Sequence, residues 1–121
     1  MNSNDLKKRT KKFAHDCVKL SLTLPKNKLG EHIARQLIRC STSTAANYRA
    51  TCLAQSKKSY ISKLSIVVEE ADESTFWLEF IIDEKLKAFD EVEPLHDEAK
   101  QLTSIFIASR KTATNNLNNI Q

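Results

Sequence analysis

The sequence predicts an all-α protein of four long helices joined by short loops, and three features of the chain support this fold class. The 121 residues include only one glycine and two prolines, which leaves few positions for the tight turns that join strands. Apolar residues recur at helical spacing over most of the chain and are separated by short polar segments. The length suits a single domain with a modest core, and we expect residues 1–121 to form it.

The first two predicted helices span residues 5–24 and 31–54. Pro25 should end the first, because proline lacks an amide proton and disfavours the α conformation in the residue before it. The run CSTSTAA at residues 40–46 forms helices poorly, so a loop could divide the second helix, but the apolar pattern keeps its phase through the run. The expected core residues are Leu6, Phe13, Cys17, Leu20 and Leu24 in the first helix and Ile33, Leu37, Cys40, Thr44 and Thr51 in the second.

The third and fourth predicted helices span residues 57–87 and 92–113. Ser56 is a suitable N-cap for the third, and Pro94 is expected in the first turn of the fourth, where proline is tolerated. The polar C-terminal tail is expected to fray. The expected core residues are Tyr60, Leu64, Val67, Val68, Ala71, Thr75, Leu78, Ile81 and Ile82, followed by Val92, Leu95, Ala99, Leu102, Phe106 and Ser109.

The third helix is apolar on two opposite sides. Ile66, Phe76, Trp77 and Phe80 lie opposite its core side, interrupted by acidic residues. An isoleucine and three aromatic residues left together in water would form an unusually large exposed patch. We therefore predict that these four residues belong to a subunit interface. Cover by flanking loops or by the N-terminal segment is the alternative.

Polar residues of the second helix are expected to fall on two sides. Asn47 lies near the core side, where we predict a buried amide that fixes the register of the bundle and needs hydrogen-bond partners. Arg35, Arg39 and Arg49 lie on the other side. An arginine row can bind phosphates or pair with carboxylates of a neighbouring helix or subunit, and we favour pairing. The residues assigned to the interface on this basis are Arg39, Arg49, Glu69 and Glu73.

Charge is divided unevenly along the chain. Residues 1–63 carry 14 Lys and Arg against 3 Asp and Glu, a net charge of +11, and residues 64–121 carry 5 against 12, a net charge of −7. This division favours RNA or DNA binding by the N-terminal half, or attraction between parts of an assembly. No aromatic residue is interleaved with the basic ones, so contacts should be mainly to phosphates. The candidate nucleic-acid-binding residues are Lys7, Lys8, Arg9, Lys11, Lys12, Lys57 and Lys58.

No catalytic or metal-binding constellation is evident in the sequence. Glu93 and His96 form a single ExxH, whereas di-iron bundles require two such fragments and two further inward glutamates. The three cysteines form no CxxC pair and are expected to be small buried thiols of a cytoplasmic protein. No apolar run is long enough to span a membrane. We therefore expect no enzymatic activity, no cofactor, no metal and no membrane partner.

The central motif resembles a known protein family. The motif is AANYRATCLAQSKKSYISKLSIVVEEADESTFWLEF, preceded by a Gln36–Thr44 run with glutamine, apolar residues, arginine and then small residues. It resembles the four-helix-bundle family that includes proteins encoded in intervening sequences of bacterial 23S ribosomal RNA genes, once called S23 ribosomal proteins. That family is related to the accessory variability proteins of diversity-generating retroelements. The similarity covers roughly residues 10–110.

The resemblance implies an antiparallel up-down four-helix bundle that assembles into a ring-like homopentamer and has no enzymatic activity. For the retroelement members it implies binding of nucleic acid and of a reverse transcriptase, so an accessory subunit or scaffold for such a protein is the alternative function. Trp77 matches an interface position of the family. The matching polar positions are Arg39, Asn47, Arg49, Lys57, Lys63, Glu70, Glu73 and Glu79.

Overall fold

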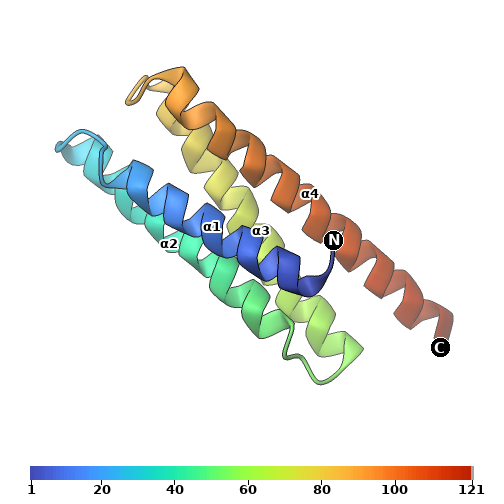
Figure 1. Ribbon diagram of the computed structural model, residues 1–121. Coiled ribbons are helices and arrows are strands. Elements are labelled where there is room, and N and C mark those ends of the chain that lie inside the picture. Colours follow the sequence, from blue (N-terminus) through green and yellow to red (C-terminus); the bar gives the residue numbers. More distant parts are fainter. Residues whose placement is uncertain (121) are drawn as a thin grey trace.

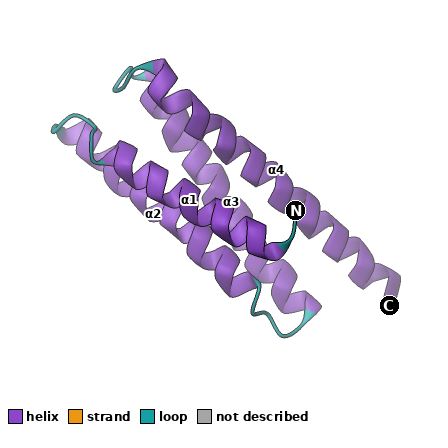
Figure 2. Ribbon diagram, in the orientation of Figure 1, coloured by secondary structure: helices purple, strands orange, loops and turns teal. Residues whose placement is uncertain are grey.

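The computed structural model describes residues 1–120, which form four antiparallel helices. They are α1 (Ser3–Ser21), α2 (Lys28–Thr51), α3 (Lys57–Asp83) and α4 (Phe89–Ile120). Consecutive helices pack side by side, and the fourth side, between α1 and α4, is the least closely packed (Figure 1). The residues described contain helices and short loops but no strand (Figure 2). The predicted all-α, four-helix fold is therefore confirmed.

Side-chain caps start the first three helices. The side chain of Asn2 accepts a hydrogen bond from the amide of Asp5, whose carboxylate accepts one from the amide of Asn2. The predicted cap at Ser56 is confirmed, because its hydroxyl accepts from the amide of Ser59 at 3.1 Å. Each cap satisfies an amide that has no partner within its own helix.

The first two helices lie about one turn closer to the N-terminus than we predicted. The helix α1 ends at Ser21 rather than at residue 24, because the next residues form tight i to i+3 hydrogen bonds that lead into Pro25. The helix α2 begins at Lys28 rather than at residue 31, since Asn27 caps it by accepting from the amide of Gly30 at 2.8 Å. Gly30 therefore lies inside the first turn of α2.

The predicted start of α3 at Lys57 is confirmed, but its predicted end and the predicted bounds of α4 were wrong. The helix α3 ends at Asp83 rather than residue 87, because Lys85 adopts a left-handed conformation with φ of 54° and the amide of Leu86 closes back on the carbonyl of Ile81. The helix α4 begins at Phe89, so Pro94 lies in its second turn and not in its first. The polar tail is helical to Ile120, so the expected fraying after residue 113 was also wrong.

The unequal helix lengths explain why α4 projects beyond the bundle in Figure 1. With 19 residues α1 is about 28 Å long, whereas α4 has 32 residues and is about 48 Å long. The last turns of α4 therefore extend past the N-terminus of α1, where only α3 is close enough to pack on them.

The core matches the predicted apolar stripes closely. Most predicted core residues are buried, and the exceptions are half-buried positions near the helix ends or at the edge of a stripe. Ser74, which the stripe did not include, is buried, whereas the neighbouring Thr75 is only half-buried. The other half-buried predictions are Tyr60, Ile82, Leu95 and Ser109.

The serine- and threonine-rich run of α2 is helical, and its buried hydroxyls bond to carbonyls of the helix itself. Thr44 donates to the carbonyl of Cys40 at 2.8 Å, and Thr51 donates to the carbonyl of Asn47 at 2.7 Å. A hydroxyl satisfied in this way can be buried without a partner on another helix. The alternative of a loop across residues 40–46 is therefore excluded.

We predict that Gly30→Ala will destabilise the fold. A Cβ at this position would lie 2.0 Å from the carbonyl oxygen of Pro25, and the backbone must shift to relieve the clash. This cost of about 1–3 kcal/mol should outweigh the better helix propensity of alanine, which favours it by about 1 kcal/mol. Urea unfolding measures the change, with Arg35→Ala on the exposed side of α2 as the control. An equally stable Gly30→Ala protein would contradict the close approach.

Candidate functional surfaces

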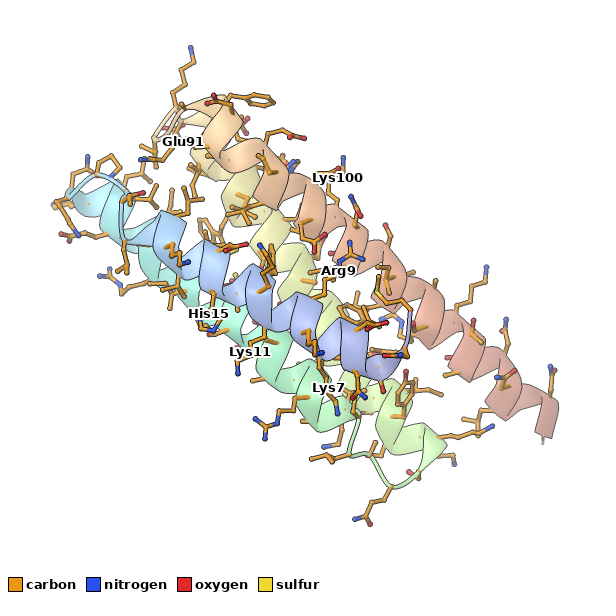
Figure 3. All side chains as sticks on the ribbon, viewed as in Figure 1. Lys7, Arg9, Lys11, His15, Glu91 and Lys100 are labelled. Atoms are coloured by element: carbon orange, nitrogen blue, oxygen red, sulfur yellow. The ribbon has the colours of Figure 1, made fainter. Side chains whose placement is uncertain are left out.

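A basic groove runs along the outside of the bundle between α1 and α2. It has a volume of about 620 Å³, and its lining includes no carboxylate. Figure 3 shows Lys7, Lys11 and His15 on the side of α1 that faces α2, and Arg49 lines the groove from α2. The full lining is Lys7, Lys8, Lys11, Ala14, His15, Val18, Thr42, Ala45, Ala46 and Arg49.

Arg9, a predicted nucleic-acid-binding residue, does not line this basic groove. Its side chain points toward α4 in Figure 3 and donates two hydrogen bonds to Glu98, from Nε to Oε2 at 2.7 Å and from Nη2 to Oε1 at 2.6 Å. Gln101 accepts a third at 2.9 Å. The hydrogen bond to Glu98 raises the pKa of Arg9, although burial acts in the opposite direction. Arg9 therefore joins α1 to α4 across the least closely packed side of the bundle.

The other predicted basic residues remain at the surface. Lys12 is exposed and pairs with Asp16 one turn along α1, with Nζ 2.7 Å from Oδ2. Lys57 and Lys58 are exposed in the first turn of α3, which contains no acidic residue. The N-terminus of α1 and that of α3 lie at the same end of the bundle (Figure 1). Three of the seven predicted residues, Lys7, Lys8 and Lys11, thus line one groove.

The outer side of α3 carries three aromatic side chains and, nearer its N-terminus, one isoleucine. We call this surface the α3 aromatic face, and its residues are Ile66, Phe76, Trp77 and Phe80. Ile66 is 43% exposed and Phe76 is 51% exposed, whereas Trp77 and Phe80 are half-buried against the core. The rings of Phe76 and Trp77 meet edge to face with centroids 4.9 Å apart, and Phe80 lies about equally close to both. Neither loops nor the N-terminal segment cover Ile66 and Phe76.

Arg39 pairs with carboxylates of α3 within the same chain. Its guanidinium bonds to Glu70 at 3.1 Å and to Glu73, which also accepts from Trp77 Nε1 at 3.1 Å. Burial alone would raise the pKa of Glu73, but the hydrogen bonds from Arg39 and Trp77 outweigh it and lower that pKa. The predicted pairing with Glu73 is confirmed between neighbouring helices. The predicted pairing with Glu69 was wrong, because Glu70 takes that place and Glu69 is exposed.

Asn47 is not the buried register-fixing amide that we predicted. It is half-buried, and its side chain donates to the carbonyl of Ser43 in its own helix at 2.8 Å. Tyr48 is buried beside it, with its ring 5.0 Å from that of Phe106. The polar residues that are buried instead are Thr10, Ser21, Ser41, Thr44, Thr51 and Ser74.

Sequence reasoning missed the apolar floor of the basic groove. Ala14 and Val18 contribute to it from α1, and Ala45 and Ala46 contribute from α2. One signal was available, because Lys7, Lys11, Ala14 and Val18 follow the alternating spacing of four and three residues that keeps one side of a helix. Only the pairing of α1 with α2 shows that this side borders a groove.

The remaining chemistry-bearing residues do not converge. His96 of the ExxH lies 3.8 Å from Glu79 of α3, and no group of histidine, cysteine or acidic residues within residues 1–120 is arranged to hold a metal ion. The three cysteines are free; Cys17 and Cys40 are buried, as expected, whereas Cys52 is only half-buried. Burial raises the pKa of the Cys40 thiol to about 11. Lys63 is exposed. None of the helices described has both the length and the apolarity needed to cross a bilayer.

Comparison with known proteins places the chain in a family. The family model described as 23S rRNA-intervening sequence protein matches residues 2–108. The chain belongs to this family. A protein of unknown function from the S23 ribosomal protein family of Bacteroides thetaiotaomicron VPI-5482 has a solved structure with 29% sequence identity and a TM-score of 0.83, and the similarity covers 92% of this chain and 99% of that one. None of the curated proteins matches. The family resemblance noted in the sequence is thus confirmed.

We predict that the Arg39–Glu73 pair makes stability depend on pH in the acid range. The pKa of Glu73 is lowered from 4.5 in the folded protein, so the pair stabilises the fold above that pH and is lost as the pH falls below it. Urea unfolding at about pH 7 and about pH 3 should show a smaller acid loss for Glu73→Gln than for the unchanged protein. Arg39→Gln should reduce the loss in the same way. Unchanged acid sensitivity in both variants would contradict the pairing.

Proposed function

We propose that this member of the family is a non-enzymatic, homo-oligomeric protein that binds the phosphate backbone of RNA or DNA. The observation that carries the proposal is the separation of its charges. Arg9 and Arg39 are paired with carboxylates inside the chain, whereas Lys7, Lys8 and Lys11 line a groove without carboxylates. Lys8 and Lys11 are exposed and Lys7 is half-buried. Surface lysines without carboxylate partners are suited to replacing the counterions of a polyanion.

Two further lysines favour an anionic partner at the same end of the bundle. Lys57 and Lys58 occupy the positive end of the α3 dipole, where acidic residues would be more stable by about 0.3–1 kcal/mol each. A phosphate close to this end would relieve the repulsion. No phenylalanine, tyrosine or tryptophan lines the groove, and His15 supplies the one ring among its lining residues on which a base could stack. Binding should therefore depend mainly on phosphate contacts and be largely independent of sequence.

The α3 aromatic face is the surface through which we propose that subunits assemble. Burying an exposed isoleucine or phenylalanine stabilises an association by roughly 1.5–3 kcal/mol per side chain. A ring of five subunits is the assembly that the family resemblance implies. A protein-interaction scaffold or an accessory subunit for a polymerase such as a reverse transcriptase is the second candidate function, which the apolar floor of the groove favours.

We expect the groove lysines to set the salt dependence of nucleic-acid binding. Replacing Lys7, Lys8 and Lys11 together by glutamine should lower the slope of log affinity against log salt by up to about 3, because each phosphate contact contributes about 1. Fluorescence anisotropy with labelled duplex RNA and duplex DNA measures the slope.

A matched triple variant controls for the loss of net charge. Lys26, Lys28 and Lys100 are exposed but lie outside the groove, and their replacement by glutamine should leave the slope nearly unchanged. Equal slopes for the two triple variants would show that binding depends on net charge and not on the groove. The absence of any binding at low salt would favour the scaffold.

Assembly should depend on the two exposed members of the α3 aromatic face. Replacing Ile66 and Phe76 together by glutamate should lower the subunit number measured by multi-angle light scattering, because two charges cannot be buried in an apolar contact without a large cost. Helix content by circular dichroism should persist, since both side chains are largely exposed.

The control uses apolar residues of comparable exposure on other helices. Ile107 in α4 is 43% exposed and Leu22 is 62% exposed, and glutamate at both positions should leave the subunit number unchanged. If the unchanged protein is a monomer, or if the Ile66 and Phe76 variant keeps the full subunit number, assembly through this face is wrong.

A further inference from the structure

The basic groove has an apolar floor that phosphate binding does not use. Ala14, Val18, Ala45 and Ala46 lie at its base between the basic side chains. A surface that contacts only phosphates requires cations and hydrogen-bond donors, and it gains nothing from small apolar residues. The floor therefore points to a ligand with apolar groups as well as negative charge.

The shape of the groove fits a helix. Its α1 wall extends from Lys7 to Val18, and eleven residues of helical rise correspond to about 16 Å, or three turns. Along this wall Lys7, Lys11, Ala14 and Val18 follow the spacing of four, three and four residues. Two parallel ridges with this spacing, one on each side of a groove, provide holes for the side chains of a third helix.

The charges on the rim specify an acidic partner. Lys7, Lys8 and Lys11 stand on the α1 side and Arg49 on the α2 side, with no carboxylate among the lining residues. Asp16, the nearest acidic residue along α1, is turned away from the groove and engaged by Lys12. A helix with glutamates flanking an apolar stripe would meet cations on both rims and small residues beneath.

We propose that the groove between α1 and α2 is a docking site for an acidic amphipathic helix of a partner protein. The partner's apolar stripe packs on the alanine and valine floor, and its flanking carboxylates pair with the lysine and arginine rims. Because Lys7, Lys8 and Lys11 also carry the proposed nucleic-acid binding, the helix and a nucleic acid compete for the groove. The docking itself does not depend on the nucleic-acid function.

The test uses designed peptides and the full-length chain. The probe is a fluorescently labelled peptide of about 18 residues, with leucine at every a and d position and glutamate at the flanking positions. A second peptide has the same composition in a scrambled order that destroys the apolar stripe, and a third carries lysine in place of glutamate. The acidic amphipathic peptide should bind at least about tenfold more tightly than either of the others, because they lack the packing or the charge match.

Two protein variants test separately how much the apolar floor and the basic rim contribute to peptide binding. Replacing Ala45 and Ala46 by glutamine fills the groove without changing the charge. It should weaken binding of the acidic peptide by about tenfold, because the peptide helix can no longer approach the floor. The same replacement at Ala108 and Ala113 of α4, which match them in exposure, should have no effect. Replacing Lys7, Lys8 and Lys11 by glutamine should also weaken binding of the acidic peptide by about tenfold.

Competition and assembly complete the test. Unlabelled acidic peptide should bind in the groove and so displace labelled duplex RNA from the protein. The lysine peptide should not bind in the groove, so it should not displace the RNA in this way. Equal binding of the scrambled and amphipathic peptides would overturn the proposal, because the groove would then act as a site for any polyanion. Unchanged affinity in the Ala45 and Ala46 variant would overturn it as well. A lower subunit number in the Lys7, Lys8 and Lys11 variant would show that a second copy of this chain occupies the groove, which also contradicts the proposal.

Discussion

The arrangement of this molecule depends on burial of the inner side of α3. Leu64, Val67, Ala71, Leu78 and Ile81 are fully buried there, between α2 on one side and α4 on the other. Each of the larger side chains contributes roughly 1.5–3 kcal/mol when it is fully buried. Because a helix has two sides, burying this one forces the opposite side, with its aromatic residues, outward.

Pairing of charges across helices then decides which basic residues stay free for partners. Arg9 is taken up by Glu98 on α4, and Arg39 by Glu70 and Glu73 on α3. These bridges hold the helices in register at the edges of the core, where apolar packing ends. Lys7, Lys8 and Lys11 of α1 have no carboxylate across the groove, so this side of the bundle keeps a cluster of positive charge between α1 and α2.

Local hydrogen bonds explain several places where intrinsic propensity misleads. The run of poor helix formers at residues 40–46 is helical. The buried hydroxyl of Thr44 bonds to the carbonyl of Cys40 one turn earlier, so it needs no partner on another helix. Lys85 has the left-handed conformation that a glycine usually adopts after the end of a helix. Because no glycine marks this position, the end of α3 could not be located from residue type. Asn47 satisfies its amide within α2, which removes the need for a buried partner.

The sequence by itself determined the four helices, most of the core and the two-sided character of α3, because these follow from apolar spacing that is written along the chain. It also identified the family through one contiguous motif, which the match over residues 2–108 confirms. Only the tertiary structure decided that Arg9 faces α4, that Arg39 takes Glu70 rather than Glu69, and that small residues of α1 and α2 share one groove with lysines. These facts depend on which sides of different helices meet. Periodicity shows which residues share one side of a helix, but it does not show which other helix packs against that side.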